Sequence, residues 1–350
     1  MFPLADIATL PAQLWTIFHR IVLPILLLAG IGYALQRTLT LDMPTLRRLN
    51  FYFIIPAIIY VNVVTSKLGG AGVALVVGFT VALWVTMAGL TLLLAWLRGV
   101  PRDQRAALLL TTVLHNSGNY GLPLQKLAFR PYGLGDRAVA NQTFVMITQN
   151  FITFTLGILI VGGGGRNTWR QNVRHMLRFP PIYALAAALI TTQIVVLLGD
   201  AAGPVRHALR PLWDVLVYVK GAFVALALVT LGAQLALVGK EAAKYRITMS
   251  VFLRLLGGPA LALGLIHLAD AALRAGGGEG LSPFLAQLLL ISSTTPTAVN
   301  CMLMCLEFEN HPDLAARAVL YSTLLSPITV TLVIFFARGE WLPLLSGLGA

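Results

Sequence analysis

The chain has 350 residues, of which 57% are hydrophobic and only 11% are charged, and its formal net charge is +12. Soluble domains usually carry about 25% charged residues, so this composition excludes an ordinary soluble domain and indicates a polytopic membrane protein. The basic residues stand in short clusters between apolar runs. That pattern is typical of loops on the cytoplasmic side of a membrane, and it argues against a nucleic-acid partner.

Apolar stretches long enough to cross a bilayer recur along the whole chain. A membrane-spanning helix needs about 20 mainly apolar residues. We expect ten spans, at 13–36, 45–66, 71–97, 104–128, 136–162, 178–199, 212–238, 246–269, 283–306 and 315–337. A Gly- and Arg-rich run at 162–178 separates five spans from five. The sequence therefore predicts a first five-helix repeat at 1–165 and a second at 166–350.

Loop charge and the ends of the chain set the expected topology. The connections after the odd-numbered spans hold more Lys and Arg than the others, which places them in the cytoplasm and both termini outside. The first residues have no basic region and no small-residue cleavage signal, so we expect no removable signal peptide. Cys301 and Cys305 share one face of an apolar helix and predict neither a disulfide nor a metal site.

The fourth span is interrupted by the polar stretch "HNSGNYGLP", residues 115–123. Gly118 and Gly121 loosen a helix there, and Pro123 lacks the N–H that a helix interior requires. The ninth span is interrupted by "SSTTPTAVN", residues 292–300. In that span Thr295 is expected to cap a new half-helix whose first residue is Pro296.

Interruptions in the same ordinal span of two five-span halves predict an inverted-repeat transporter with its binding site at the bilayer midplane. Each break frees backbone N–H groups and directs a positive half-helix end toward that site. The side chains around the breaks are neutral, and the main candidates are Asn116, Ser117, Asn119, Tyr120, Thr297 and Asn300. Dipoles and amide N–H donors favour an organic anion, most simply a monocarboxylate. We expect no metal and no cofactor.

Several polar residues have more than one interpretation. His115 either carries a coupling proton or makes a packing contact. Asn50 and Gln234 occupy corresponding spans of the two halves and either face the site or bond neighbouring helices. Lys220 and Arg254 are expected to snorkel toward the membrane surface. His115 next to Ser117 lacks a G-x-S-x-G context, so we do not expect an enzyme.

The motifs also resemble a known family. "NSGNYGLPLQ" and "TPTAVN" in the broken spans, with "LNFYFIIPAIIY" in span 2 and "ALALVTLGAQLAL" in span 7, are similar to the auxin efflux carriers of plants and bacteria. The resemblance implies ten helices in two inverted repeats, as in sodium/bile-acid symporters, in a bacterial inner membrane. It also implies a scaffold of spans 1, 2, 6 and 7 that mediates a homodimer, and a transport domain of spans 3–5 and 8–10 that moves as an elevator.

Carried over by motif, the resemblance implies a carboxylate site where spans 4 and 9 cross at Pro123 and Pro296. The residues implied to bind the substrate are Asn116, Asn119, Tyr120, Pro123, Pro296, Thr297 and Asn300. The resulting hypothesis is an elevator-type exporter of an auxin-like or small monocarboxylate, driven by the membrane potential alone. The alternatives are a sodium- or proton-coupled organic-anion symporter of the same fold, a channel, and a membrane receptor without transport.

Overall fold

The computed structural model describes residues 4–65, 70–161, 180–199, 202–237, 247–308, 310–339 and 344–345. Within these ranges the chain forms α-helices joined by short 3-10 and π-helical segments, with no β-strand. The prediction of an all-helical protein is confirmed for this part of the chain. The run at 162–178 lies outside the described residues, and with it the expected boundary between the two halves at 165.

The described helices of the first half include three runs that continue through π-helical turns. In order, the elements are α1 (Leu4–Ile17), η1 (Phe18–Val22), α2 (Leu23–Leu39), α3 (Met43–Leu49), η2 (Asn50–Ile54), α4 (Ile55–Thr65), α5 (Gly70–Leu97), η3 (Arg102–Gln104), α6 (Arg105–Val113), α7 (Gly121–Phe129), η4 (Arg130–Tyr132), α8 (Gly135–Ile152), η5 (Thr153–Gly157) and α9 (Ile158–Val161). Those of the second half are α11 (Pro180–Leu198), α12 (Ala202–Ala208), α13 (Arg210–Ala236), α14 (Thr248–Phe252), η7 (Leu253–Gly257), α15 (Gly258–Ala275), α16 (Pro283–Ser293), α17 (Val299–Glu307) and α18 (Pro312–Arg338).

Five helical runs among the described residues are long and apolar enough to cross a membrane. They are Pro11–Leu39, Gly70–Leu97, Arg210–Ala236, Thr248–Ala275 and Pro312–Arg338. The helical segments in the other five predicted intervals fall short of that length or apolarity among the described residues, so the total of ten spans stays a prediction. Large apolar side chains face outward on these helices, such as Trp96 at 66% and Tyr218 at 78% exposure. Such a surface suits lipid and is unusual for a soluble protein.

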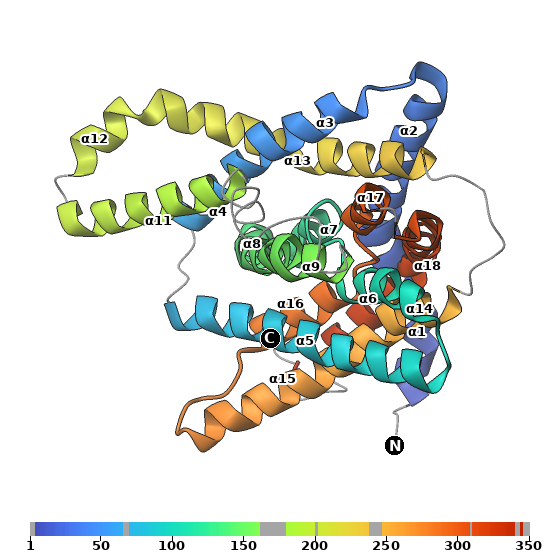
Figure 1. Cartoon of the computed structure of the whole chain (residues 1–350). Coiled ribbons are helices and arrows are strands. Elements are labelled where there is room, and N and C mark those ends of the chain that lie inside the picture. The colour runs from blue at the N-terminus through green and yellow to red at the C-terminus, as the bar shows by residue number, and fades with distance from the viewer. Residues whose placement is uncertain are drawn as a thin grey trace.

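One group of helices packs through unusually close backbone contact. α13 lies against α2 and α4, and α11 lies against α4, on the upper side of the molecule in Figure 1. A Cβ on Gly32 would lie 2.0 Å from the carbonyl oxygen of Val229, and one on Gly232 would lie 1.8 Å from that of Ala29. Only glycine permits this approach, which is typical of helix pairs in membranes. We call this group, α2, α4, α11 and α13, the glycine-packed group.

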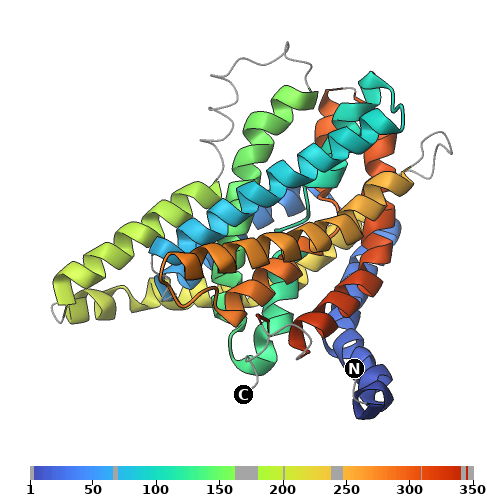
Figure 2. The same ribbon diagram turned by 90° about the horizontal axis from the view of Figure 1, so that it is seen from below.

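The remaining long helices form a second group that contains both interrupted helices. α5 packs against α6, α8 and α15, while α18 packs against α6, α16 and α17. Figure 2 shows α5 and α15 running across one face of this group. We call α5–α8 and α14–α18 the crossing group, because the two breaks meet inside it. α7 also contacts α13 and η1, so the crossing lies against the glycine-packed group.

Candidate binding site at the crossing of two broken helices

The two interruptions of the helices pair with each other. α6 ends at Val113 and α7 begins at Gly121, while α16 ends at Ser293 and α17 begins at Val299. His115 and Thr297 form an isolated antiparallel bridge. In it the N–H of Asn116 donates to the carbonyl of Pro296 (2.7 Å), and that of Ala298 donates to the carbonyl of Leu114 (2.9 Å). Segments about 180 residues apart in sequence thus satisfy each other's backbone where neither is helical.

The carbonyl groups at the end of α6 are capped by side chains from other elements. Thr297 Oγ1 donates to the carbonyl of Thr111 (2.8 Å), and Cys301 Sγ donates to that of Leu110 (3.3 Å). Buried backbone carbonyls in a membrane need such partners, because lipid supplies none. These contacts explain why Thr297 and Cys301 are buried at the crossing.

The end of α16 is capped by its own threonines. Thr294 Oγ1 donates to the carbonyl of Ile291 (2.6 Å), and Thr295 Oγ1 donates to that of Ser292 (2.9 Å). The prediction that Thr295 caps a helix starting at Pro296 is therefore wrong. α17 starts at Val299, because the residues before it are held in the extended bridge with the first break.

At the N-terminal ends of α7 and α17, several backbone N–H groups lack a hydrogen-bond acceptor within the described residues. Gly121 N–H donates to the carbonyl of Asn116 (2.8 Å). The backbone N–H groups of Gly118, Asn119, Val299 and Asn300 donate no hydrogen bond within the described part of the chain. Unpaired N–H groups at a helix N-terminus form a ready anion-binding site, since the helix dipole adds positive potential there.

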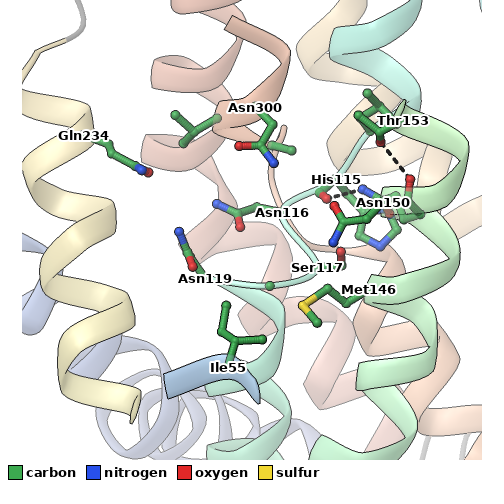
Figure 3. A pocket seen from close by; sticks show the side chains of 15 residues that line it. Ile55, His115, Asn116, Ser117, Asn119, Met146, Asn150, Thr153, Gln234 and Asn300 are labelled. Atoms are coloured by element: carbon green, nitrogen blue, oxygen red, sulfur yellow. Dashed lines mark hydrogen bonds between the residues drawn. The ribbon is translucent and has the colours of Figure 1, made fainter. Parts of the chain in front are cut away.

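A pocket opens beside these N–H groups, between the crossing and the glycine-packed group. Figure 3 shows Gln234 of α13 on one side and Asn116, Asn119 and Asn300 facing it across the pocket. The cavity volume is about 40 Å³, on a scale where one water needs roughly 10–15 Å³. The pocket is lined by Ile55, Leu114, His115, Asn116, Ser117, Gly118, Asn119, Met146, Gln149, Asn150, Thr153, Gln234, Ala298, Val299 and Asn300.

Uncharged amide groups dominate the polar lining of the pocket. The side-chain amides of Asn119, Asn150 and Asn300 make no hydrogen bond within the described residues. Gln234 Oε1 is buried without a partner, and Asn116 uses only its Oδ1, which accepts from the N–H of Tyr120 (3.3 Å). The pocket therefore presents several N–H donors, and its lining holds no Asp, Glu, Lys or Arg, so that His115 is the one titratable side chain among the lining residues.

The structure divides the predicted site residues into two sets. His115, Asn116, Ser117, Asn119, Asn300 and Gln234 line the pocket, whereas Tyr120, Pro123, Thr295, Pro296 and Thr297 do not. Tyr120 is 1% exposed, and its hydroxyl accepts a hydrogen bond from Ser326 (3.1 Å). Asn50 lies away from the pocket and donates to Thr230 Oγ1 on α13 (2.7 Å), which is the helix–helix alternative for that residue.

His115 is the one histidine of the pocket lining, and within the described residues its main-chain carbonyl is hydrogen-bonded whereas its ring is not. Its carbonyl accepts a hydrogen bond from Gln149 Nε2. Both ring nitrogens are buried and have no hydrogen-bond partner in the part of the chain that the structure describes. The ring also borders a second, smaller cavity of about 10 Å³, together with Thr80 and Ser292.

Three polar residues of the pocket, on α8 and η5, were not among the residues predicted from the sequence. Gln149, Asn150 and Thr153 line the pocket, and the polar run "NQTFVMITQN" at 141–150 in an expected span was the signal that could have found them. Gln142 supports the crossing from the same helix by donating to the carbonyl of Ser117 (3.1 Å).

The expectation of snorkelling is wrong for Arg254. Arg254 is 0% exposed and donates to the carbonyls of Thr112 (3.1 Å) and Ser293. It therefore lies at the crossing, where a π-helical turn and the glycine after it leave room for the guanidinium. Lys220 instead forms an ion pair with Asp136 (3.1 Å), with its side chain 21% exposed.

Comparison with known proteins relates nearly the whole chain to one family. The family described as membrane transport protein matches residues 17–172 and 165–334. A similar protein from Methanothermobacter thermautotrophicus (strain Delta H), described as an uncharacterized transporter, is 24% identical over 319 residues. That alignment covers 89% of this chain and 95% of the relative.

Proposed function

This chain belongs to the membrane transport protein family of the auxin efflux carriers, and we propose that it carries an organic anion across the cytoplasmic membrane by alternating access. The family assignment makes it a transporter rather than an enzyme. The proposal adds the class of substrate, the site and the mechanism.

The observation that carries the proposal is the set of free donors at the crossing. Gly118, Asn119, Val299 and Asn300 line a pocket without acidic side chains, and their N–H groups donate no hydrogen bond within the described residues. Each half-helix N-terminus stabilises an anion by roughly 0.3–1 kcal/mol, and by up to about 2 kcal/mol where partly buried. Two such ends with several amide donors favour a carboxylate over a cation or a neutral sugar.

The size and the apolar part of the pocket point to a monocarboxylate. A cavity of about 40 Å³ holds roughly three waters on the scale given above, which matches a carboxylate group. Ile55, Leu114 and Met146 supply apolar contacts for an organic body, auxin-like or smaller. Because the observed space is too small for that body, we propose that the pocket opens further when substrate binds.

The architecture supports an elevator mechanism. We propose ten spans in two inverted five-helix halves, 1–165 and 166–350, with the glycine-packed group as scaffold and the crossing group with α9 as transport domain. The pocket lies where the two groups meet, since Gln234 comes from α13 and Asn300 from α17. Movement of one group past the other would then expose the site to opposite sides. We also propose that the scaffold mediates a homodimer in a bacterial inner membrane, with both termini outside.

The economical driving force is the membrane potential. A monoanion that leaves a negative-inside cell gains roughly 2.3 kcal/mol per 100 mV, which is enough for export by uniport. A second candidate is proton coupling through His115, because both of its ring nitrogens are buried and have no hydrogen-bond partner among the described residues. Protonation of that ring would give the site a charge that the neutral ring lacks.

The test is flux in proteoliposomes that contain the purified full-length protein. Radiolabelled benzoate, indole-3-acetate and propionate are compared with succinate, while sodium, pH gradient and potassium–valinomycin potential are varied separately. We expect monocarboxylate flux that follows the potential and needs no sodium. Flux that requires sodium would replace uniport by sodium symport, and flux that requires a pH gradient and is lost in His115→Gln would select proton coupling. If no carboxylate moves, the anion-site proposal is wrong.

A further inference from the structure

Arg254 is an unusual charged group for this protein. It lies in the π-helical turn η7, between α14 and α15, and its side chain is 0% exposed. Of the Lys, Arg, Asp and Glu side chains that the structure describes, only this one is buried. Burying a charged side chain inside a membrane protein costs free energy, and such residues often belong to a functional site. The buried position of Arg254 is therefore a candidate for a functional role.

The hydrogen bonds of Arg254 join the ends of both interrupted helices. Its Nη1 donates to the carbonyl of Thr112 in the last turn of α6 (3.1 Å), and its Nη2 donates to the carbonyl of Ser293, the last residue of α16. A Cβ on Gly258 would lie 2.4 Å from Nη2. The absence of a side chain at Gly258 therefore leaves the space that the guanidinium occupies.

The charges at this place balance without an acidic residue. A helix C-terminus carries the equivalent of about −0.5 elementary charge, so two ends together match the single positive charge of Arg254. Among the described residues no Asp or Glu side chain is buried. The guanidinium is thus held by peptide dipoles, and these contribute no net charge. The only charge that α6 and α16 hold in the buried interior of the described residues is therefore the positive charge of Arg254.

We propose that Arg254 is the fixed counter-charge of the transported site, so that the substrate-loaded site crosses the membrane as an electrically neutral unit. This inference rests on the proposed elevator transport of a monoanion. The substrate contributes one negative charge and Arg254 one positive charge, while the half-helix dipoles contribute none. The empty site keeps the positive charge. A negative-inside potential therefore acts on the return of the empty site toward the cytoplasm, and in this way it drives net export.

This arrangement separates two kinds of flux. Exchange of labelled for unlabelled substrate uses only the loaded movement, so it should not respond to voltage. Net efflux includes the empty return and should respond. One charge that crosses the whole field shifts an equilibrium about 50-fold per 100 mV, and a rate with a midway barrier changes about seven-fold.

The experiment measures both fluxes in proteoliposomes at 0 and −100 mV, with saturating substrate on both sides for the exchange. The probe is radiolabelled benzoate, or the panel monocarboxylate with the highest flux. For the wild type we expect exchange to change less than about two-fold, and net efflux to change by up to about seven-fold. In Arg254→Gln the loaded site carries the anion's charge, so exchange should become voltage-dependent to a similar extent.

Matched variants separate this role from a structural one. Arg254→Lys keeps the charge and should retain voltage-independent exchange, while Arg98→Gln removes an exposed arginine outside the helices and should behave as the wild type. Voltage-dependent exchange in the wild type overturns the inference even if Arg254→Gln fails to fold. An even loss of all rates in Arg254→Gln, with exchange still insensitive to voltage, also overturns it. Absence of any carboxylate flux overturns the proposed function and this inference with it.

Discussion

Two residues near the start of α17 give a sharp test of the binding site, because their side chains point to different surroundings. The Asn300 amide lines the pocket and makes no hydrogen bond within the described residues. Thr297 is 0% exposed, and its hydroxyl donates to the carbonyl of Thr111 (2.8 Å). Asn300→Ala therefore removes a group that is free for a ligand, whereas Thr297→Val removes a group that holds the crossing together.

We expect Asn300→Ala to lower the affinity for substrate and Thr297→Val to lower the stability of the protein. A hydrogen bond to a charged group contributes about 1.5–3 kcal/mol, so Asn300→Ala should weaken carboxylate binding by about 10- to 150-fold. Its effect on the free energy of unfolding should stay within about 0.5 kcal/mol, as for other groups without partners. Thr297→Val leaves a buried carbonyl unpaired, which costs about 1–3 kcal/mol of stability, and it should change substrate affinity little.

The assay combines two measurements on each purified variant. Binding is measured with radiolabelled benzoate, or with the monocarboxylate that shows the highest flux, and thermal unfolding is followed by tryptophan fluorescence. We expect the affinity to fall only in Asn300→Ala and the melting temperature only in Thr297→Val. If Asn300→Ala lowers the melting temperature and leaves the Kd unchanged, the amide is a packing contact and the reasoning about free donors is refuted.

Three further substitutions test the packing around the site. Gly232→Ala places a Cβ 1.8 Å from the carbonyl oxygen of Ala29, so α2 and α13 must separate. We expect the free energy of unfolding to fall by several kcal/mol, which is measured as a lower melting temperature or as lost expression. Gly121→Ala places a Cβ 2.7 Å from Gln142 Nε2, so transport should fall at least ten-fold in the flux assay while the protein still inserts. Asn50→Ala removes the hydrogen bond to α13; it should lower stability by about 1 kcal/mol and leave the substrate Kd unchanged.

The breaks could be located from sequence because their causes are local. The interruptions at 115–123 and 292–300 could be predicted because several polar residues stand there together with proline, and at the first also with glycine, inside otherwise apolar runs. A single proline is not sufficient, since Pro11 lies inside α1 and Pro327 inside α18. The match of their ordinal positions in two halves also followed from counting spans. The residue at which the second half-helix begins could not be predicted in this way, because Thr295 and Pro296 are held by the bridge between His115 and Thr297.

The all-helical membrane character, the two broken spans and the uncharged polar residues around them could be predicted from residue types, since composition and local helix breakers decide these properties. Which of the polar groups face the pocket depends on how the helices pack. Asn300 opens to the pocket while Thr297, on the same segment, caps α6, and this choice depends on the other break. The position of the Arg254 side chain could not be predicted either, because a cation two turns inside a span is expected to extend toward the membrane surface. Its carbonyl partners, Thr112 and Ser293, come from helices 142 and 39 residues away in the chain, and no local pattern brings them together.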